Sequence, residues 1–118
     1  MAFVIKDRIK EDTSVTGTGD ASLAGAGDTF DTFSSVMSNG DTTDYAIFHR
    51  INSIDEWEVG TGTYNSSTNA MARTTVLSSS NSGNKVDFSA GLKSIIMTQP
   101  ASKIVKQGDV VALAIALG

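Results

Sequence analysis

Apolar and polar residues alternate with a period of two along most of this chain, and this pattern limits its fold more than any other feature. Residues 45–51 (YAIFHRI), 56–64 (EWEVGTGTY) and 70–80 (AMARTTVLSSS) each show it, and polar turn sequences such as NSST separate them. Successive side chains of a strand point to opposite faces, so the pattern is typical of half-buried strands. No segment offers an amphipathic helix of ordinary length, which argues against a βαβ fold.

Further strands are expected on both sides of this central region. Residues 3–10 alternate between apolar and charged side chains, and residues 85–91 and 94–99 carry apolar positions next to turn sequences. Several strands at short spacings, joined by turns, are typical of antiparallel sandwiches and small barrels. We therefore predict an all-β fold, a small antiparallel β-sandwich or barrel-like domain, with residues 1–118 forming a single domain.

The C-terminal end is predicted to differ from the rest of the domain. Residues 100–109 (PASKIVKQGD) are expected to form a connector, and residues 110–118 an apolar interface strand. Its larger side chains alternate with Val110 and three alanines, and these larger residues are Val111, Leu113, Ile115 and Leu117. An exposed apolar strand would promote aggregation of a lone monomer. We expect this strand to be buried against a sibling subunit, and an ordinary core strand is the alternative interpretation.

The segment DEWEVGTGTYN, residues 55–65, is interpreted as a strand with one face in the core. By alternation, Glu56 and Glu58 share the face that points to water. Four side chains from this strand and the preceding one are expected to anchor the core: Trp57, Val59, Tyr45 and Ile47.

Glycine pairs of the form Gly-x-Gly occur three times, but none matches a nucleotide-binding loop. The dinucleotide fingerprint needs a third glycine three positions later, and the phosphate loop needs Gly-Lys-Ser/Thr; the sequence has neither. Gly60 and Gly62 are instead expected to permit a bulge or a close approach between backbones. We expect no cofactor.

Catalytic and metal chemistry is not favoured by the remaining residues. His49 is the single histidine and cysteine is absent, so carboxylates would have to supply the other ligands of a zinc ion. A Ser-His-Asp triad would lack its Gly-x-Ser-x-Gly elbow. Glu56 and Glu58 project from one strand, whereas glycosidase carboxylates flank a cleft. The sequence thus predicts no catalytic, cofactor-binding or metal site, and a protein that is not an enzyme.

The charge and hydropathy of the chain limit its partners. A net charge of −4 and a pI near 4.7 argue against sequence-independent nucleic-acid binding. The longest apolar run, residues 110–117, is too short to span a bilayer, and the N-terminus shows no secretory signal. We expect no nucleic-acid or membrane partner, and a soluble protein made in a cytoplasm.

A series of motifs resembles, in its order, a recurrent module of tailed bacteriophages. The motifs are KDRIKEDT…TGTGD, SNGDTTDYAI, EWEVGTGTYN, ARTTVLSSSN and VDFSAGLKSIIMTQPASK, and they cover about residues 6–103. The module is found in virion proteins, often at the N-terminal, particle-proximal end of tail-fibre-like proteins. The resemblance implies a non-enzymatic virion structural protein, tail-associated or fibre-attachment-like, made in the bacterial host cytoplasm and present in several copies.

Two alternatives remain open. Fibre proteins continue into a shaft and a receptor-binding tip, whereas this sequence ends at Gly118, so a capsid decoration (cement) protein on the head surface is the second interpretation. In both cases the partners are sibling subunits and other phage particle proteins, and a homotrimer is expected by analogy. A more distant alternative is a small carbohydrate-binding module with Trp57, Tyr64 and Tyr45 as stacking platforms, which requires Trp57 to be exposed.

Overall fold

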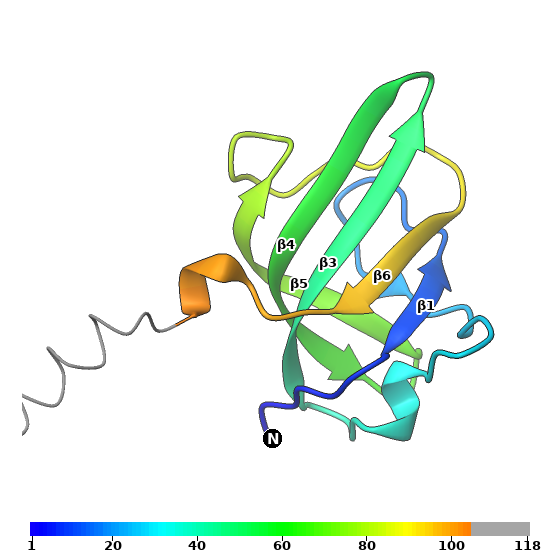
Figure 1. Ribbon diagram of the computed structural model, residues 1–118, viewed down its shortest axis with the longest axis vertical. Coiled ribbons are helices and arrows are strands. Elements are labelled where there is room, and N and C mark those ends of the chain that lie inside the picture. The colour runs from blue at the N-terminus through cyan, green and yellow to red at the C-terminus, as the bar shows by residue number, and fades with distance from the viewer. Residues whose placement is uncertain (105–118) are drawn as a thin grey trace, which may run out of the picture.

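Six strands form one antiparallel sheet in the part of the chain that the computed structural model describes, residues 1–104 (Figure 1). The strands are β1 (Lys10–Thr13), β2 (Ala21–Ser22), β3 (Thr42–Ile51), β4 (Ile54–Asn65), β5 (Ala70–Ser79) and β6 (Lys93–Met97). Two short 3₁₀ turns accompany them, η1 (Phe33–Ser35) and η2 (Ala101–Lys103). The strand order is β1-β6-β3-β4-β5-β2, so the long β3–β4 hairpin lies at the centre of the sheet.

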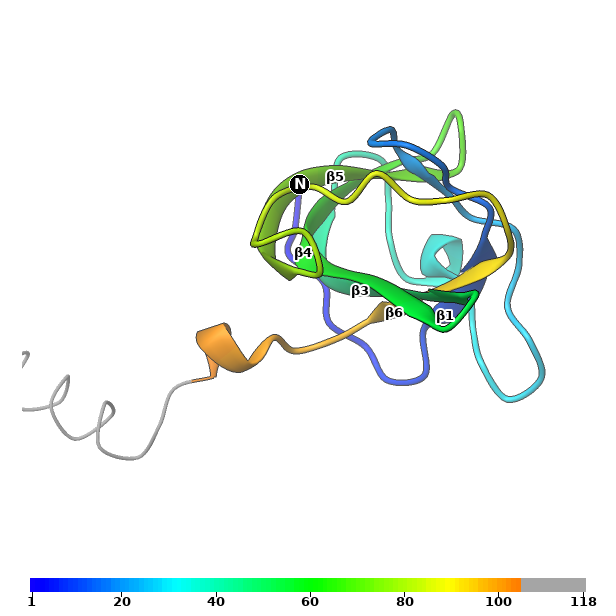
Figure 2. The same ribbon diagram turned by 90° about the horizontal axis from the view of Figure 1, so that it is seen from above.

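The sheet curls into a nearly closed barrel (Figure 2). Backbone hydrogen bonds join β1 to the segment that follows β2. The Asp12 N–H donates to the Gly25 carbonyl oxygen at 3.0 Å, and the Ala24 N–H donates to the Asp12 carbonyl oxygen at 2.9 Å. Closure pairs edge groups that an open sheet would expose. The predicted all-β, barrel-like fold is thereby confirmed.

The β3–β4 hairpin determines which side chains point into the barrel. Directly opposite residues share a face of the sheet, and Tyr45 lies opposite Gly60, as Ile47 lies opposite Glu58. Tyr45 and Ile47 are fully buried, so Gly60 and Glu58 also point inward. Trp57 belongs to the alternate set, which faces outward.

The assignment of Trp57 and Val59 to the core is therefore wrong. Trp57 is 36% exposed and Val59 is partly exposed, whereas Glu58 is fully buried. Glu56 shares the inward face with Glu58 and is only partly exposed. The prediction assumed that glutamates face water. Inside this barrel Arg73 from β5 compensates the Glu58 carboxylate, with 2.6 Å between Arg73 Nη2 and Glu58 Oε1.

Large apolar side chains fill the barrel interior, and the strand residues that lie directly against two of them are glycines, which have no Cβ. A Cβ on Gly60 would lie 2.4 Å from the Thr75 carbonyl oxygen and 2.8 Å from the Tyr45 hydroxyl, and one on Gly62 would lie 2.7 Å from the Met71 side chain. The β4–β5 register shifts beside both glycines. The expected bulges and close approaches are thus confirmed. The largest fully buried apolar side chains are Tyr45, Phe33, Ile9, Ile47, Met71 and Ile95.

Two of the expected strands are mostly absent. In residues 3–10, only isolated bridges at Phe3 and Ile9 precede β1, because Arg8 adopts a φ of 60° that interrupts extended backbone. In residues 85–91, a single bridge joins Phe88 to the 14–20 loop. Both segments therefore contribute buried side chains without forming a regular strand.

The chain leaves the barrel through η2, which stands off the sheet in both views (Figures 1 and 2). Lys103 Nζ donates to Asp44 Oδ1 at 2.7 Å and to Thr61 Oγ1 at 3.0 Å, so η2 is tied to the outer face of β3 and β4. The predicted interface strand, residues 110–118, lies outside the described residues, together with its side chains Val111, Leu113, Ile115 and Leu117.

Candidate functional site

The outer face of the β3–β4 hairpin carries four successive cross-strand pairs of changing character. From η2 towards the hairpin turn they are Asp44–Thr61, Ala46–Val59, Phe48–Trp57 and Arg50–Asp55. The first pair binds Lys103, and the last is an ion pair with 2.7 Å between Arg50 Nη1 and Asp55 Oδ1. The two middle pairs are apolar. Polar groups therefore bound a short apolar surface at both ends.

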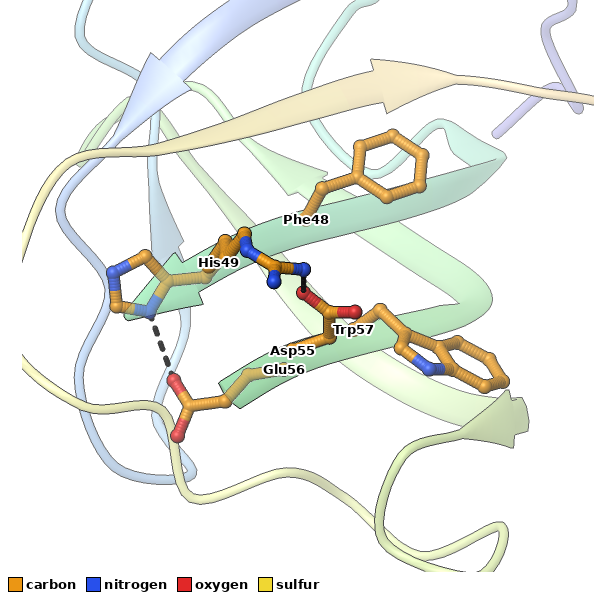
Figure 3. Close-up of a pocket in the computed structure, with 6 residues that line it drawn as sticks. Phe48, His49, Asp55, Glu56 and Trp57 are labelled. Carbon is orange, nitrogen blue, oxygen red and sulfur yellow. Dashed lines mark hydrogen bonds and ion pairs between the residues drawn. The ribbon is translucent and has the colours of Figure 1, made fainter. Parts of the chain in front are cut away.

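Phe48 and Trp57 line an open pocket of about 440 Å³ near the hairpin turn (Figure 3). Phe48 is 50% exposed and Trp57 is 36% exposed, and both project away from His49 and Glu56. Aromatic side chains in partly exposed positions provide large, rigid contact areas for partners. This pair is the most prominent apolar feature on the outer face of the hairpin.

A second depression, of about 480 Å³, shares Phe48 with the first and extends towards η2. Ala46 and Val59 come from the adjacent outward pair, and Leu77 lies between the paired positions of the β4–β5 bulge. Pro100 contributes from the segment that leads to η2. We call the two depressions together the outer groove. Its apolar lining is Ala46, Phe48, Trp57, Val59, Leu77 and Pro100, and polar side chains such as Arg50, Asp55, Ser78 and Gln99 border it.

The inner face of the same hairpin holds a buried ion pair instead. Arg73 Nε and Nη2 donate to Glu58 Oε2 and Oε1 at 2.8 and 2.6 Å. The Tyr45 hydroxyl and the Val86 N–H donate to the same carboxylate at 2.5 and 2.8 Å. Further donors of Arg73 reach backbone carbonyl oxygens of Gly17, Gly19 and Val86. The pair therefore fastens two loops to the barrel.

These contacts change the ionisation of both acidic groups. Burial by itself raises the pKa of Glu58, but hydrogen bonds from Arg73, Tyr45 and Val86 outweigh it and hold that pKa below its ordinary value. Burial, followed by the hydrogen bond to the Glu58 carboxylate, raises the pKa of the Tyr45 hydroxyl above its ordinary value. Glu58 is consequently a charged acceptor whose oxygens are occupied.

His49 lies beside a carboxylate and a hydroxyl, but the order of their contacts is not that of a catalytic triad. His49 Nδ1 lies 2.8 Å from Glu56 Oε1 (Figure 3), and the Ser89 hydroxyl donates to Glu56 Oε2 at 2.8 Å. In a triad the imidazole accepts the proton of the hydroxyl. Here Glu56 lies between them and joins β3 and β4 to the loop before β6. Although burial raises the pKa of Glu56, hydrogen bonds from His49 and Ser89 lower it below its ordinary value.

Tyr64, one of the proposed sugar platforms, is buried in the core like Tyr45. Within residues 1–104 there is no group of three His, Cys, Asp or Glu side chains suited to a metal ion. No helix in this part of the chain is long and apolar enough to cross a membrane. The outer groove is thus the strongest candidate for function. The contributions of Phe48 and Leu77 to the groove were missed, although the NSID turn sequence gives the cross-strand register that pairs Phe48 with Trp57.

No protein-family model matches the sequence, and neither the curated proteins nor the solved structures gave a significant match. The fold and the site together describe a small, nearly closed β-barrel with a filled interior and an apolar groove on its outer wall.

Proposed function

We propose that the chain is a non-enzymatic structural protein of a tailed-bacteriophage virion, tail-associated or fibre-attachment-like, that assembles as a homo-oligomer on the particle. The observation that carries this proposal is the outer groove. A contiguous apolar depression on the surface of a folded domain usually marks an interaction site. Core side chains fill the barrel interior, so a partner would bind at the surface, where the groove lies. The resemblance to phage modules supplies the particle as the setting.

The polar clusters support a structural role in preference to catalysis. Both oxygens of Glu58 and both oxygens of Glu56 accept hydrogen bonds within the barrel. A catalytic acid or base needs access to its substrate. Tying the loops to the barrel is therefore the role that these carboxylates fit best.

Recombinant full-length protein tests the homo-oligomer. We expect a trimer by native mass spectrometry and light scattering. Deleting residues 108–118 should leave a barrel that is folded by circular dichroism but monomeric. A full-length chain that is monomeric at every concentration would contradict the proposal. A truncated chain that fails to fold would instead identify residues 110–118 as an intramolecular core strand.

Cryo-electron microscopy of purified particles tests the location. Density for the barrel near the attachment point of the tail fibres is the expected result. Density repeated over the head surface would favour the alternative, a capsid decoration protein. Absence of the protein from purified particles would reject both.

A carbohydrate-binding module is the second candidate, and the exposure of Trp57 favours it. The sugar platform would be Phe48 and Trp57, because Tyr45 and Tyr64 are buried. Under this function, Trp57→Ala abolishes glycan binding in a glycan array and in titration calorimetry. Ile54→Ala, at an exposed residue outside the groove, is the matched control. A wild-type chain that binds no glycan on the array removes this candidate.

A further inference from the structure

We propose that the outer groove of each copy receives residues 110–117 of a second copy. This inference rests on the proposed homo-oligomeric function and names the two surfaces that meet. The groove supplies apolar side chains on one copy, and the run VVALAIAL supplies them on the other.

The first argument is the match in chemistry. The centre of the groove is apolar, with Ala46 and Val59 next to the exposed Phe48 and Trp57. Residues 110–117 carry no charge and no polar side chain. Burying one against the other removes both from water, which is the main driving force for association.

The second argument is the match in spacing. In an extended chain, every second side chain lies on the same side, at intervals of about 6.6 Å. The outward residues of β3 and β4 repeat at the same interval, as Ala46 and Phe48 on β3 and Val59 and Trp57 on β4. An extended segment running along the hairpin can thus turn its four larger side chains towards this face, with two of them at a time over the two apolar pairs. The four side chains are Val111, Leu113, Ile115 and Leu117. The alanines between them then face away.

The third argument is the path of the chain, which favours a second copy over the chain's own groove. Lys103 ties η2 beside one end of the groove, and Ile104, the last described residue, is 52% exposed. β6 ends with Met97 opposite Tyr45, so the chain runs away from the β3–β4 turn as it reaches η2, which projects beyond the barrel wall in both views (Figures 1 and 2). Residues 105–109 span at most about 18 Å when fully extended. Binding along its own groove towards the β3–β4 turn would require the chain to reverse its direction within these residues.

Cysteine cross-linking between two differently sized copies tests this arrangement, because the natural chain contains no cysteine. One copy carries Leu77→Cys in the groove, and the other, enlarged by an N-terminal tag, carries Leu113→Cys or Ile115→Cys. After mixing and mild oxidation, we expect a disulfide-linked heterodimer on a non-reducing gel. Ala114→Cys, on the opposite side of the extended segment, is the matched control and should cross-link several-fold less. Thr74→Cys, an exposed β5 position outside the groove, should cross-link equally poorly.

The disruption experiment uses Phe48→Asp on the Leu77→Cys copy, with Phe48→Ser as a milder second variant. Circular dichroism verifies folding, and either folded variant should reduce the cross-link several-fold. If the wild-type protein is oligomeric but neither Leu113→Cys nor Ile115→Cys links to the groove, this inference is overturned while the proposed function stands. Preferential linkage to Thr74→Cys, or linkage only when both cysteines lie in one chain, overturns it equally. A monomeric wild-type protein overturns both proposals.

Discussion

Glu58 is a charged residue whose burial depends on its neighbours. Its carboxylate is fully buried and accepts hydrogen bonds from Arg73, Tyr45 and the Val86 backbone. A buried ion pair adds little stability beyond a well-packed apolar pair, but the loss of one partner leaves an uncompensated charge inside the protein. The contribution of Glu58 is therefore revealed by removing its charge alone.

Glu58→Gln should destabilise the barrel by about 3 to 5 kcal/mol, because Arg73 would remain charged and buried without its counter-ion. Urea unfolding followed by circular dichroism gives this difference. Asp55→Asn is the matched control, since the Arg50–Asp55 pair is mostly exposed and should contribute about 1 kcal/mol or less. Equal losses of unfolding free energy in the two variants would show that the buried charge of Arg73 does not need Glu58 as its counter-ion.

Gly60→Ala should destabilise the fold by about 1 to 3 kcal/mol, because a Cβ there would overlap the Thr75 carbonyl oxygen and force the Tyr45 ring to move. Gly27→Ala is the control, since no atom lies within 4 Å of the Cβ position at Gly27. Thermal melts of the two variants provide the comparison. A melting temperature for Gly60→Ala at or above that of the wild type would contradict the close approach.

At the scale of elements, the β3–β4 hairpin serves two environments with one alternating sequence. Its inward residues complete the core and the buried ion pair, and its outward residues form the outer groove. A change of register would therefore disturb the core and the outer groove at once. Under the proposed function, substitutions of outward residues should chiefly affect assembly.

The fluorescence of Trp57, the single tryptophan, should report on assembly. At 36% exposure in the isolated barrel, it should be accessible to acrylamide in the chain lacking residues 108–118. In the full-length oligomer the groove is covered under our proposal, so the Stern–Volmer quenching constant should fall several-fold. Quenching that is equal in the two chains would show that assembly leaves Trp57 uncovered.

At the scale of the whole molecule, charged groups as well as apolar packing hold the loops to the barrel. Glu56 and Glu58 together join the hairpin to β5, through Arg73, and to the loop before β6, through Val86 and Ser89. Both pKa values are lowered in the folded state, so both carboxylates bind protons more weakly there than in the unfolded chain. Their contribution to stability is complete above the ordinary glutamate pKa of about 4.3.

Stability should therefore be lost as the pH falls below about 4 and through the lowered folded-state values. Thermal melts from pH 7 to pH 2.5 would measure this loss. Glu56→Gln should make the acid slope shallower, because one of the two groups no longer takes up a proton on unfolding. A melting temperature that rises on acidification would contradict the lowered pKa values of Glu56 and Glu58. An unchanged dependence of the melting temperature on pH in Glu56→Gln would contradict the part assigned to Glu56.

The general character of the fold could be predicted from the sequence because the relevant signals are local. Alternation and turn residues predicted strands at 45–51, 56–64 and 70–80, and the structure has β3, β4 and β5 there. The Gly-x-Gly segment was correctly interpreted as a place of close backbone approach, since only glycine tolerates it. The interruption of the expected strand in residues 3–10 could not be predicted. Arg8 adopts a positive φ there, and an arginine, unlike a glycine, does not indicate such a backbone in the sequence.

The face to which each strand residue points was decided only by the tertiary structure. A period of two is unchanged when the two faces are exchanged, so Trp57 inside and Glu58 inside are equally compatible with the alternation. The choice depends on Arg73, which is 15 positions from Glu58 along the chain and reaches its carboxylate only after β4 and β5 pair. The outer groove likewise depends on β3, β4, β5 and the segment before η2 meeting in space. Local sequence determined the strands, and long-range pairing determined which of their side chains remain available to a partner.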